Sequence, residues 1–445
     1  DIIPRPLYDL LIRILNQKKR TKFPNSLKCF AATLHFHSPA AYLFVRKEFL
    51  KCLPHQNTLR KWMQNINSNS GISTQTLKII SDVILNAQEK ENKIVFNLTI
   101  DEMSIKQRID WDGQKSYGFV DIGTRFVHGD VLPASKVLVF MLLLKTVLCA
   151  LYEKNVDVVS ITFDGASSNI SICEELGARL KPIDIEDIVP YFAHPNNEHK
   201  RISIFYDACH MVKLVRNAID KYNLNDKDSR TISWKYIKQL VFLQDAEKLY
   251  PAVKIGHRHI NFNNEKMKVS LAVQVLSTSV CDALKFLEYP QFAAASGTAI
   301  FCKMLNDIFD LLNSKSLYAK TEIKKAITRD NLLILKDEIN EFISYIKSLK
   351  IQDTFLLQSI RKTFIRLIID LQNSIAVAEK LFNESTIEFL LTYKLSQDHI
   401  ETWFALIRRM NGYNNNPSAK QFQSSFRKIL FTKNMSVPSR ANCTP

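Results

Sequence analysis

Apolar residues recur with helical spacing near the start of this chain and then break off. Two such runs, residues 27–34 and 40–50, are followed by the irregular stretch 53–56, which contains a proline. Asn57 or Thr58 can then cap a further helix, which carries basic residues. This order is the outline of a helix-turn-helix, whose second helix can enter the major groove of DNA. The pattern alone is weak, because many small helical bundles share it.

Beyond a polar linker at residues 67–73, strand and helix patterns alternate. Apolar and β-branched runs predict strands over residues 94–100, 117–123, 156–163 and about 201–206. Amphipathic runs predict helices over residues 77–87, 142–155 and 211–222. Strands interleaved with helices predict an α/β sheet with helices on its faces. From about 226 to 385 the strand patterns fade, and helices are predicted over residues 234–250, 266–286, 299–314, 329–349 and 357–382.

The basic residues are concentrated at the two ends of the chain. Residues 1–80 hold 13 basic and 3 acidic side chains, and residues 401–445 hold 7 and 1. Because the whole chain carries +16, the 320 residues between them have no net charge. Basic ends around a neutral middle are typical of a nucleic-acid binder, since Lys and Arg displace counterions from phosphates. Solubility, or attraction to another polyanion such as an anionic membrane surface, is the alternative.

Length, composition and cysteine spacing exclude several classes of protein. At 445 residues and 46% hydrophobic, the chain is too long for one core and too apolar to be disordered. The longest apolar stretch, 137–152, is interrupted by Lys145 and is too short for a membrane helix, so we expect no membrane span. The eight cysteines form no C-x-x-C pair, which disfavours a zinc finger or a disulfide framework and suits a reducing compartment.

Candidate chemistry lies in acidic residues at the ends of the predicted strands. Asp101 and Asp164 each close an apolar strand, at the edge where open α/β sheets bind ligands. Either residue alone is more often only a turn former. Asp398 and Glu401 are spaced to share one face of a helix, which could bring a third carboxylate to that edge. Three carboxylates suit a site that holds two Mg²⁺ ions for phosphoryl transfer.

Several longer motifs indicate a family. The acidic residues stand within Ile100-Asp-Glu-Met103, Asp164-Gly-Ala-Ser-Ser-Asn169 and Ser396-Gln-Asp-His-Ile-Glu-Thr-Trp-Phe404. Further motifs lie between them, at residues 194–195, 205–217, 259–261 and 268–272. Together, and in this order, they resemble the motifs of P-element transposases and their vertebrate THAP-domain relatives. The resemblance covers nearly the whole chain.

The resemblance implies an α/β RNase H-like (DDE transposase) catalytic domain, interrupted by a mostly α-helical insertion domain, behind an N-terminal helix-turn-helix. The expected segments are the helix-turn-helix at 1–70, the catalytic domain at 71–225 and 386–412, the insertion at 226–385 and a basic segment at 413–445. Asp101, Asp164 and Glu401 would be the catalytic, metal-binding triad. The protein would act in the nucleus as a homodimer or larger homo-oligomer, on transposon-end and target DNA.

The resemblance also implies that the insertion binds GTP, as a cofactor that is not hydrolysed. The matching positions are Lys254, Lys268, Val269, Asn306, Asp310 and Asp398. One further acid of the family has only a rough counterpart, Asp245. No G-x-x-x-x-G-K phosphate loop occurs, so an ordinary P-loop GTPase is disfavoured. Candidate DNA contacts are Arg60 and Lys61 in the helix-turn-helix, and Arg408, Arg409, Lys420, Arg427 and Lys428 near the C-terminus.

The chain departs from the family pattern in two places. The family's zinc-binding THAP domain and coiled coil are not present, as expected if Asp1 is an internal position of a longer protein. Residues 137–141 also run directly into the predicted helix, where the family has a further strand and loop. We therefore expect a missing segment near residues 141 and 142.

Three functions remain compatible with the motifs. The leading one is a cut-and-paste transposase that cuts transposon ends and joins the 3′-hydroxyl to target DNA. The alternative is a domesticated nuclear DNA-binding protein with a vestigial catalytic site. A resolvase-like nuclease on the same fold would not need the helical insertion. All three acids are present, which favours the transposase, and fold alone does not separate the three.

Overall fold

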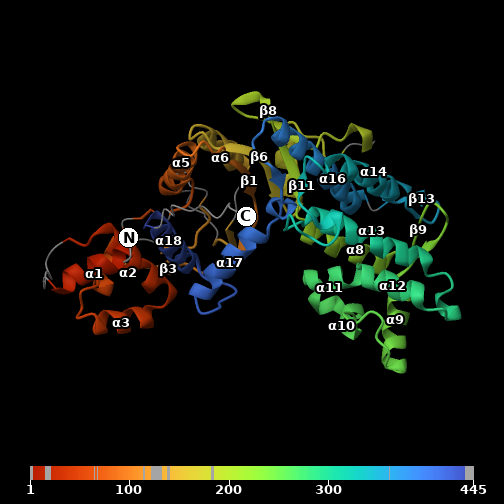
Figure 1. The fold of residues 1–445 in the computed structure, drawn as a ribbon, viewed down its shortest axis with the longest axis horizontal. Helices are drawn as coiled ribbons and strands as arrows, with labels where there is room; N and C mark the ends of the chain where they lie inside the picture. Colours follow the sequence, from red (N-terminus) through yellow and green to blue (C-terminus); the bar gives the residue numbers. More distant parts are fainter. Residues whose placement is uncertain are drawn as a thin grey trace. The chain divides into compact units, whose positions relative to one another are not determined.

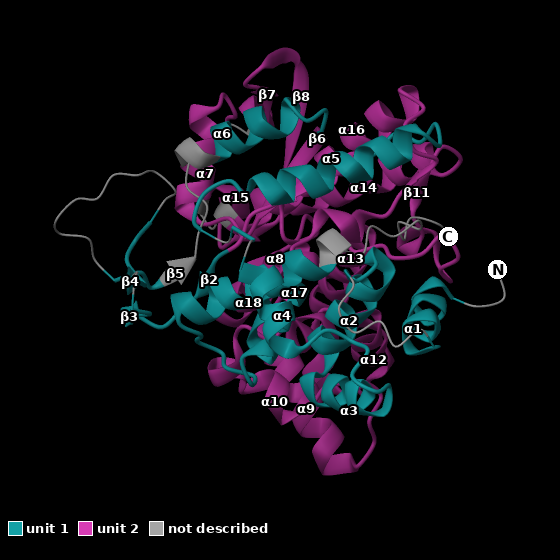
Figure 2. Ribbon diagram, turned by 90° about the vertical axis from the view of Figure 1, so that its left-hand side faces the viewer, with its two compact units in different colours: residues 1–94, 102–156, 402–445 teal, residues 95–101, 157–401 magenta. Residues whose placement is uncertain are grey.

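The computed structural model describes residues 4–15, 22–64, 66–67, 69–113, 116–121, 133–137, 141–181, 185–359 and 361–435 (Figure 1). The chain divides into two compact units (Figure 2). Unit 1 comprises residues 1–94, 102–156 and 402–445, and unit 2 comprises residues 95–101 and 157–401.

Unit 1 begins with a helical module. Its helices are α1 (Arg5–Leu15), α2 (Asn25–His37), α3 (Pro39–Glu48) and α4 (Gln56–Gln64), followed by α5 (Thr74–Gln88). Ser38 caps α3 by accepting a hydrogen bond from the Ala41 amide. The expected helix, break and helix are therefore present. The expected cap of α4 is wrong, because α4 begins at Gln56 and the Asn57 amide donates to His55 Nδ1 instead.

The C-terminal helix α18 (Ala419–Met435) belongs to the same module. Leu430 and Phe431 lie in one buried cluster with Leu27, Leu59 and other apolar residues of α1–α4. Burying these side chains together stabilises the arrangement through the hydrophobic effect. The charge pattern predicted only a basic C-terminal segment. Its helix α18 also completes the core of the helical module.

The remaining elements of unit 1 are short strands, α6 (Met141–Tyr152) and residues 402–410 of α17 (Asp398–Met410). Strand β2 (Met103–Ser104) pairs with β5 (Lys136–Val137), and β3 (Asp110–Trp111) pairs with β4 (Ser116–Tyr117). The strand expected at 117–123 is only partly present in its described part: Tyr117 ends β4, and Phe119 forms an isolated antiparallel bridge with Pro133. Residues 138–140 and part of that strand lie outside the described residues. Helix α6 includes Met141 and Leu142, and the missing segment expected there stays a prediction.

Unit 2 is built on a four-stranded sheet in the order β1-β6-β8-β7. Strands β1 (Val95–Thr99), β6 (Asp157–Phe163) and β8 (Asn197–Tyr206) are parallel, and β7 (Tyr191–His194) is antiparallel to β8. Apolar residues of β6 and β8 are almost completely buried, as expected of central strands covered on both faces. Helix α16 (Arg361–Asn383) packs on β8 and on α8 (Ala208–Lys221) (Figure 1).

Helices dominate the rest of unit 2, as expected. They are α7 (Ser167–Glu175), α9 (Trp234–Glu247), α10 (His257–Ile260), α11 (Val269–Val275), α12 (Thr278–Phe286), α13 (Ser296–Leu312), α14 (Leu332–Ser348) and α15 (Leu356–Ser359). The short strands are β9 (Leu224–Asn225), β10 (Thr231–Ile232), β11 (Ile327–Thr328), β12 (Lys350–Ile351), β13 (Thr354–Phe355) and β14 (Phe389–Leu390).

The single helix predicted over 266–286 is wrong, because the structure has two. The first ends at Val275, and Ser277 caps the second, since its hydroxyl accepts from the Val280 amide. By length and composition alone, Val269–Phe286 is apolar enough to cross a membrane. This stretch is divided between α11 and α12, and 44% of it is buried inside the protein.

Candidate active site at the carboxyl edge of the sheet

Asp101 and Asp164 follow neighbouring parallel strands. Thr99 of β1 lies opposite Thr162 of β6, and the Ile100 amide donates to the Thr162 carbonyl over 2.8 Å. Each aspartate stands two residues beyond this pair of threonines, so both emerge at the same edge of the sheet. The structure therefore places two of the three predicted acids on adjacent strands, where the register of the ladder fixes their backbones.

Glu401 reaches this edge through the first turn of α17. The side-chain amide of Gln397, just before this helix, donates to the Ile100 carbonyl over 2.7 Å. The Glu401 amide in turn donates to the Gln397 carbonyl over 3.0 Å. Glu401 is therefore anchored, through one buried glutamine, to the residue that precedes Asp101.

Asp207 is a fourth acid at the edge, at the end of β8. Its amide donates to the Phe163 carbonyl, which immediately precedes Asp164. Its carboxylate accepts from the amides of Gln397 and His210, at 3.0 and 2.7 Å, and only 3% of the residue is exposed. Burial raises the pKa of Asp207 despite these hydrogen bonds, and the charges of nearby Glu401 and Asp398 raise it further. Asp207 thus holds backbone in place and does not face an open site.

The turn after Asp164 is clamped from α16. Gly165 has φ +86°, a left-handed conformation that favours glycine, and Asp164 Oδ1 accepts from the Ala166 amide over 2.9 Å. The Arg366 guanidinium donates to the Gly165 carbonyl over 2.8 Å and lies over the ring of Tyr206. Sequence reasoning missed Arg366, because it stands in a predicted helix without a motif. Asp207 and Gln397 stand inside the quoted motifs, which did not reveal their roles.

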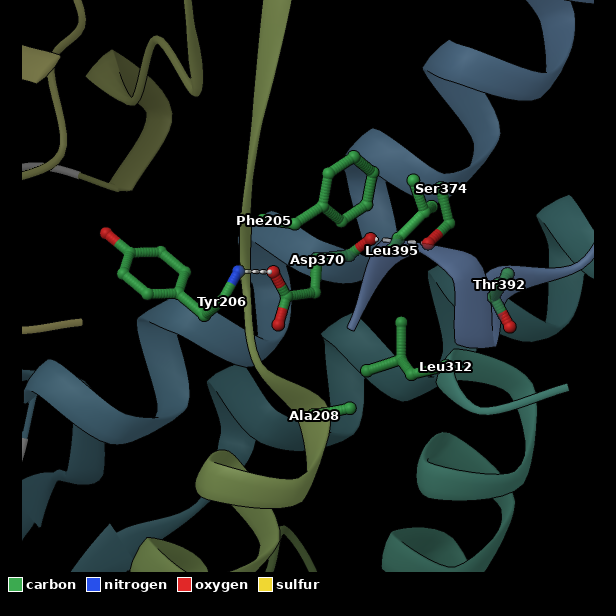
Figure 3. A pocket seen from close by; sticks show the side chains of 8 residues that line it. All are labelled: Phe205, Tyr206, Ala208, Leu312, Asp370, Ser374, Thr392 and Leu395. Carbon is green, nitrogen blue, oxygen red and sulfur yellow. Dashed lines mark hydrogen bonds between the residues drawn. The ribbon is translucent and has the colours of Figure 1, made fainter. Parts of the chain in front are cut away.

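A buried acid of α16 lies below this edge, in the core. Asp370 is 1% exposed, and its Oδ1 accepts from the Tyr206 amide over 2.7 Å (Figure 3). Its Oδ2 has no hydrogen-bond partner within the described part of the chain and lies beside a small cavity that Ser374 and Thr392 also line. Burial raises the pKa of Asp370 well above its ordinary value.

The donor set of Asp101, Asp164 and Glu401 fits Mg²⁺ in its chemistry, because hard divalent cations prefer carboxylate oxygens. Asp101 and Asp164 are partly exposed and Glu401 is exposed, so solvent and ions can reach them. Across the described residues, no three His, Cys, Asp or Glu side chains are grouped closely enough to hold one metal ion as they stand. The backbone brings the three acids to one edge, and the side chains have not converged on a single point.

Two of the predicted GTP-binding residues lie on α13, and a third lies at the start of α17. Asn306 accepts from the Thr278 amide and donates to Asp310 over 2.8 Å. Asp310 pairs with Lys324 over 3.0 Å, while burial raises its pKa. The third, Asp398, starts α17 and pairs with Lys315 over 3.4 Å.

The other predicted nucleotide contacts are more dispersed. Lys268 precedes Val269 at the start of α11 and pairs with Glu265. Lys254 is exposed in the turn before α10. The rough counterpart acid, Asp245, pairs with His257 over 2.5 Å.

The predicted DNA contacts lie on three helices of unit 1. Arg60 and Lys61 are exposed on α4, Arg408 and Arg409 belong to α17, and Lys420, Arg427 and Lys428 belong to α18. The pKa of His35 on α2 is lowered by burial and then by the charges of Lys428 and Arg60. Both cations therefore lie close to one side chain.

Two cations of α18 lie near the β3–β4 hairpin. Lys420 lies over the ring of Tyr117, and the charge of Arg427 acts on the same residue. The structure thus distributes the basic residues of α18 between the helical module and this hairpin.

A mostly parallel sheet with acids at its carboxyl edge, a long helical insertion and a preceding helix-turn-helix define an RNase H-like transposase fold. Family models match the chain in this order. They are the P transposase-like HTH domain at residues 2–62, the TNP-like RNase H N-terminal domain at 68–143, the TNP-like GTP-binding insertion domain at 209–326 and the TNP-like RNase H C-terminal domain at 393–427. The chain belongs to the P-element transposase family, which confirms the expected family and fold.

Curated relatives and a solved structure agree with this assignment. DNA transposase THAP9 of Homo sapiens is 25% identical over 94% of this chain and 49% of its own length. Transposable element P transposase of Drosophila melanogaster is 27% identical, over 95% of this chain and 56% of its own length. The chain thus spans about half the length of these relatives. The Drosophila P element transposase strand transfer complex matches with a TM-score of 0.78 and 26% identity, covering 96% of both chains.

Proposed function

We propose that this protein is a DNA transposase of the P-element type, which cuts transposon ends and joins the freed 3′-hydroxyl to target DNA. The observation that supports this proposal best is that the backbones of three acids, from distant parts of the chain, emerge at one edge of the sheet. Asp101 and Asp164 follow β1 and β6, and Glu401 is tied to them through Gln397. Carboxylates brought together in this way suit phosphoryl transfer.

In this proposal Asp101, Asp164 and Glu401 would hold two Mg²⁺ ions. The bound ions would lower the pKa of an attacking water or 3′-hydroxyl and stabilise the departing oxygen. The chain's own contribution is orientation: the strand register fixes Asp101 and Asp164, and α17 carries Glu401. The Arg366 guanidinium beside Gly165 holds the turn that presents Asp164.

The basic residues of unit 1 would bind DNA phosphates. Arg60 and Lys61 on the exposed side of α4 would contact transposon-end or target DNA, and Lys428, whose charge acts on His35 as that of Arg60 does, would contact DNA as well. Arg408, Arg409, Lys420 and Arg427 would extend this contact.

We further propose that the protein acts in the nucleus as a homodimer or larger homo-oligomer.

The proposal is tested with purified protein, labelled transposon-end DNA, Mg²⁺ and GTP, by measuring nicked and joined products. Asp101→Asn keeps the size of the side chain and removes its charge, so we expect cleavage to fall by about 10³-fold or more. DNA affinity should stay within about twofold. Loss of DNA binding together with cleavage would show that Asp101 is structural.

We also propose that the insertion binds GTP as a cofactor that is not hydrolysed. Asp310, held by Asn306 and Lys324, could accept the amino and imino protons of guanine. Asp310→Asn should weaken GTP binding about tenfold or more, measured by calorimetry, and leave binding of ATP unchanged. Unchanged GTP affinity would remove Asp310 from the nucleotide pocket. Asp330→Asn, also in unit 2 and an exposed carboxylate, is the matched control.

A domesticated DNA-binding protein remains the second candidate, because the acidic side chains form no ready metal cluster across the described residues. The two candidates differ in one measurement. A vestigial site would leave DNA binding intact and give no cleavage in the unsubstituted protein, with either Mg²⁺ or Mn²⁺.

A further inference from the structure

Gln397 occupies an unusual position for an uncharged residue at an acidic site. It is 4% exposed and connects three segments of unit 2 that are far apart in the sequence. Its side chain donates to the Ile100 carbonyl, its amide donates to Asp207, and its carbonyl accepts from the Glu401 amide. One residue therefore touches the backbone next to Asp101, the end of β8 and the first turn of α17.

We propose that Gln397, held by Asp207, is a positioning residue that sets Asp101 and Glu401 at the separation needed to share a divalent cation. The inference rests on the proposed function, since it assumes that these acids hold a metal. Asp101 leaves the sheet one residue after the carbonyl that Gln397 holds. Glu401 stands one helical turn after Gln397, in the first turn of α17.

Asp207 contributes to this positioning by holding the backbone of Gln397. Because one carboxylate oxygen accepts from the Gln397 amide and the other from the His210 amide, both oxygens are occupied by backbone donors. A buried carboxylate that is engaged in this way orients the segments that donate to it. Partners of this kind around a metal site typically change metal affinity 10- to 100-fold when they are replaced.

Asn97 provides a matched control. Its side-chain amide donates to the Lys394 carbonyl over 3.1 Å, and its Oδ1 accepts from Ser160 and Thr162. Asn97 therefore joins β1 to the same segment before α17, by the same kind of bond. It does so four residues before Asp101 and without touching the backbone of either acid. Replacing it removes a similar structural link and leaves the Gln397 contacts in place.

The experiment measures Mn²⁺ binding to the full chain by electron paramagnetic resonance, alongside thermal unfolding. Gln397→Met keeps the length of the side chain and removes its donor, and we expect Mn²⁺ affinity to fall about tenfold or more. Asn97→Leu should change Mn²⁺ affinity less than about twofold while lowering the melting temperature at least as much. Asp207→Asn, which keeps one acceptor, should weaken Mn²⁺ binding in the same direction as Gln397→Met.

The possible results separate this inference from the proposed function. If Asp101→Asn leaves Mn²⁺ binding unchanged, the metal site itself is wrong. If Asp101→Asn abolishes Mn²⁺ binding and Gln397→Met does not weaken it, the proposed function stands and the positioning role of Gln397 is overturned. If Gln397→Met and Asn97→Leu weaken Mn²⁺ binding equally, in proportion to their loss of stability, Gln397 is merely structural and the inference again fails.

Discussion

The acidic edge of unit 2 and the basic helices of unit 1 are held in place by different kinds of contact. At the acidic edge, buried polar groups such as Gln397, Asp207 and Thr162 bond to specific backbone atoms. In unit 1, an apolar cluster holds α4 and α18 together, and cations such as Arg60 and Lys420 project from exposed positions.

This difference suits the two kinds of chemistry that we propose for the protein. Phosphoryl transfer depends on the separation of a few atoms, which directional hydrogen bonds can set. Phosphate binding depends mainly on the number of cations near the DNA, which an apolar core can support without fixing each side chain. We therefore expect substitutions at the acidic edge to act steeply and those on the basic helices to act gradually.

Among substitutions that leave the three acids in place, a change in the turn after Asp164 should give the largest effect. A Cβ added to Gly165 would lie 2.5 Å from Arg366 Nη1, in a backbone conformation that disfavours side chains. Gly165→Ala should lower stability by about 1–3 kcal/mol and cleavage by more than about tenfold. Gly177→Ala is the matched control, since Gly177 has φ +109° and open space around its Cβ. Equal losses of cleavage in the two variants would show that backbone strain, and not the clamp by Arg366, controls the site.

The basic helices should respond in smaller and additive steps. Arg60→Ala and Lys428→Ala should each weaken DNA binding by less than about tenfold and reduce the salt dependence by about one ion, measured by fluorescence anisotropy at several salt concentrations. The double variant should equal the sum of the two free-energy changes. Lys47→Ala, an exposed cation on α3, is the control. A loss of DNA affinity much larger than about tenfold in either single variant would contradict this, and would mean that DNA binding here also depends on exact geometry.

Asp370 should give the smallest effect, and one that depends on pH. Because burial raises its pKa, the folded protein keeps a proton that the unfolded chain releases above about pH 4. Stability from this residue is therefore present at low pH and is lost as pH rises toward the folded pKa. Asp370→Asn removes this loss, so its melting temperature should exceed that of the unsubstituted protein by about 2–4 °C at pH 8.

That advantage of Asp370→Asn should shrink toward pH 4, where both proteins carry an uncharged group at this position. Asp353→Asn, an exposed aspartate of the same unit, should show no such trend. A difference that stays constant between pH 4 and pH 8 would contradict a raised pKa at Asp370.

Periodicity and motif order determined much of this protein. The strands that end before Asp101 and Asp164 and the helical insertion follow from local patterns, because burial of apolar residues imposes a period on each element. The acids themselves were identifiable because each closes an apolar strand or opens a helix.

Tertiary structure alone decided how the distant parts meet. The hydrogen bond between Gln397 and Ile100 joins residues 297 positions apart, and the local sequence of neither segment predicts this contact. Arg366 became a site residue only because α16 packs on β8. The basic tail likewise became part of a core through Leu430 and Phe431. Local sequence sets which groups a segment offers, whereas long-range packing selects which of them meet, because that choice depends on the free energy of the whole unit.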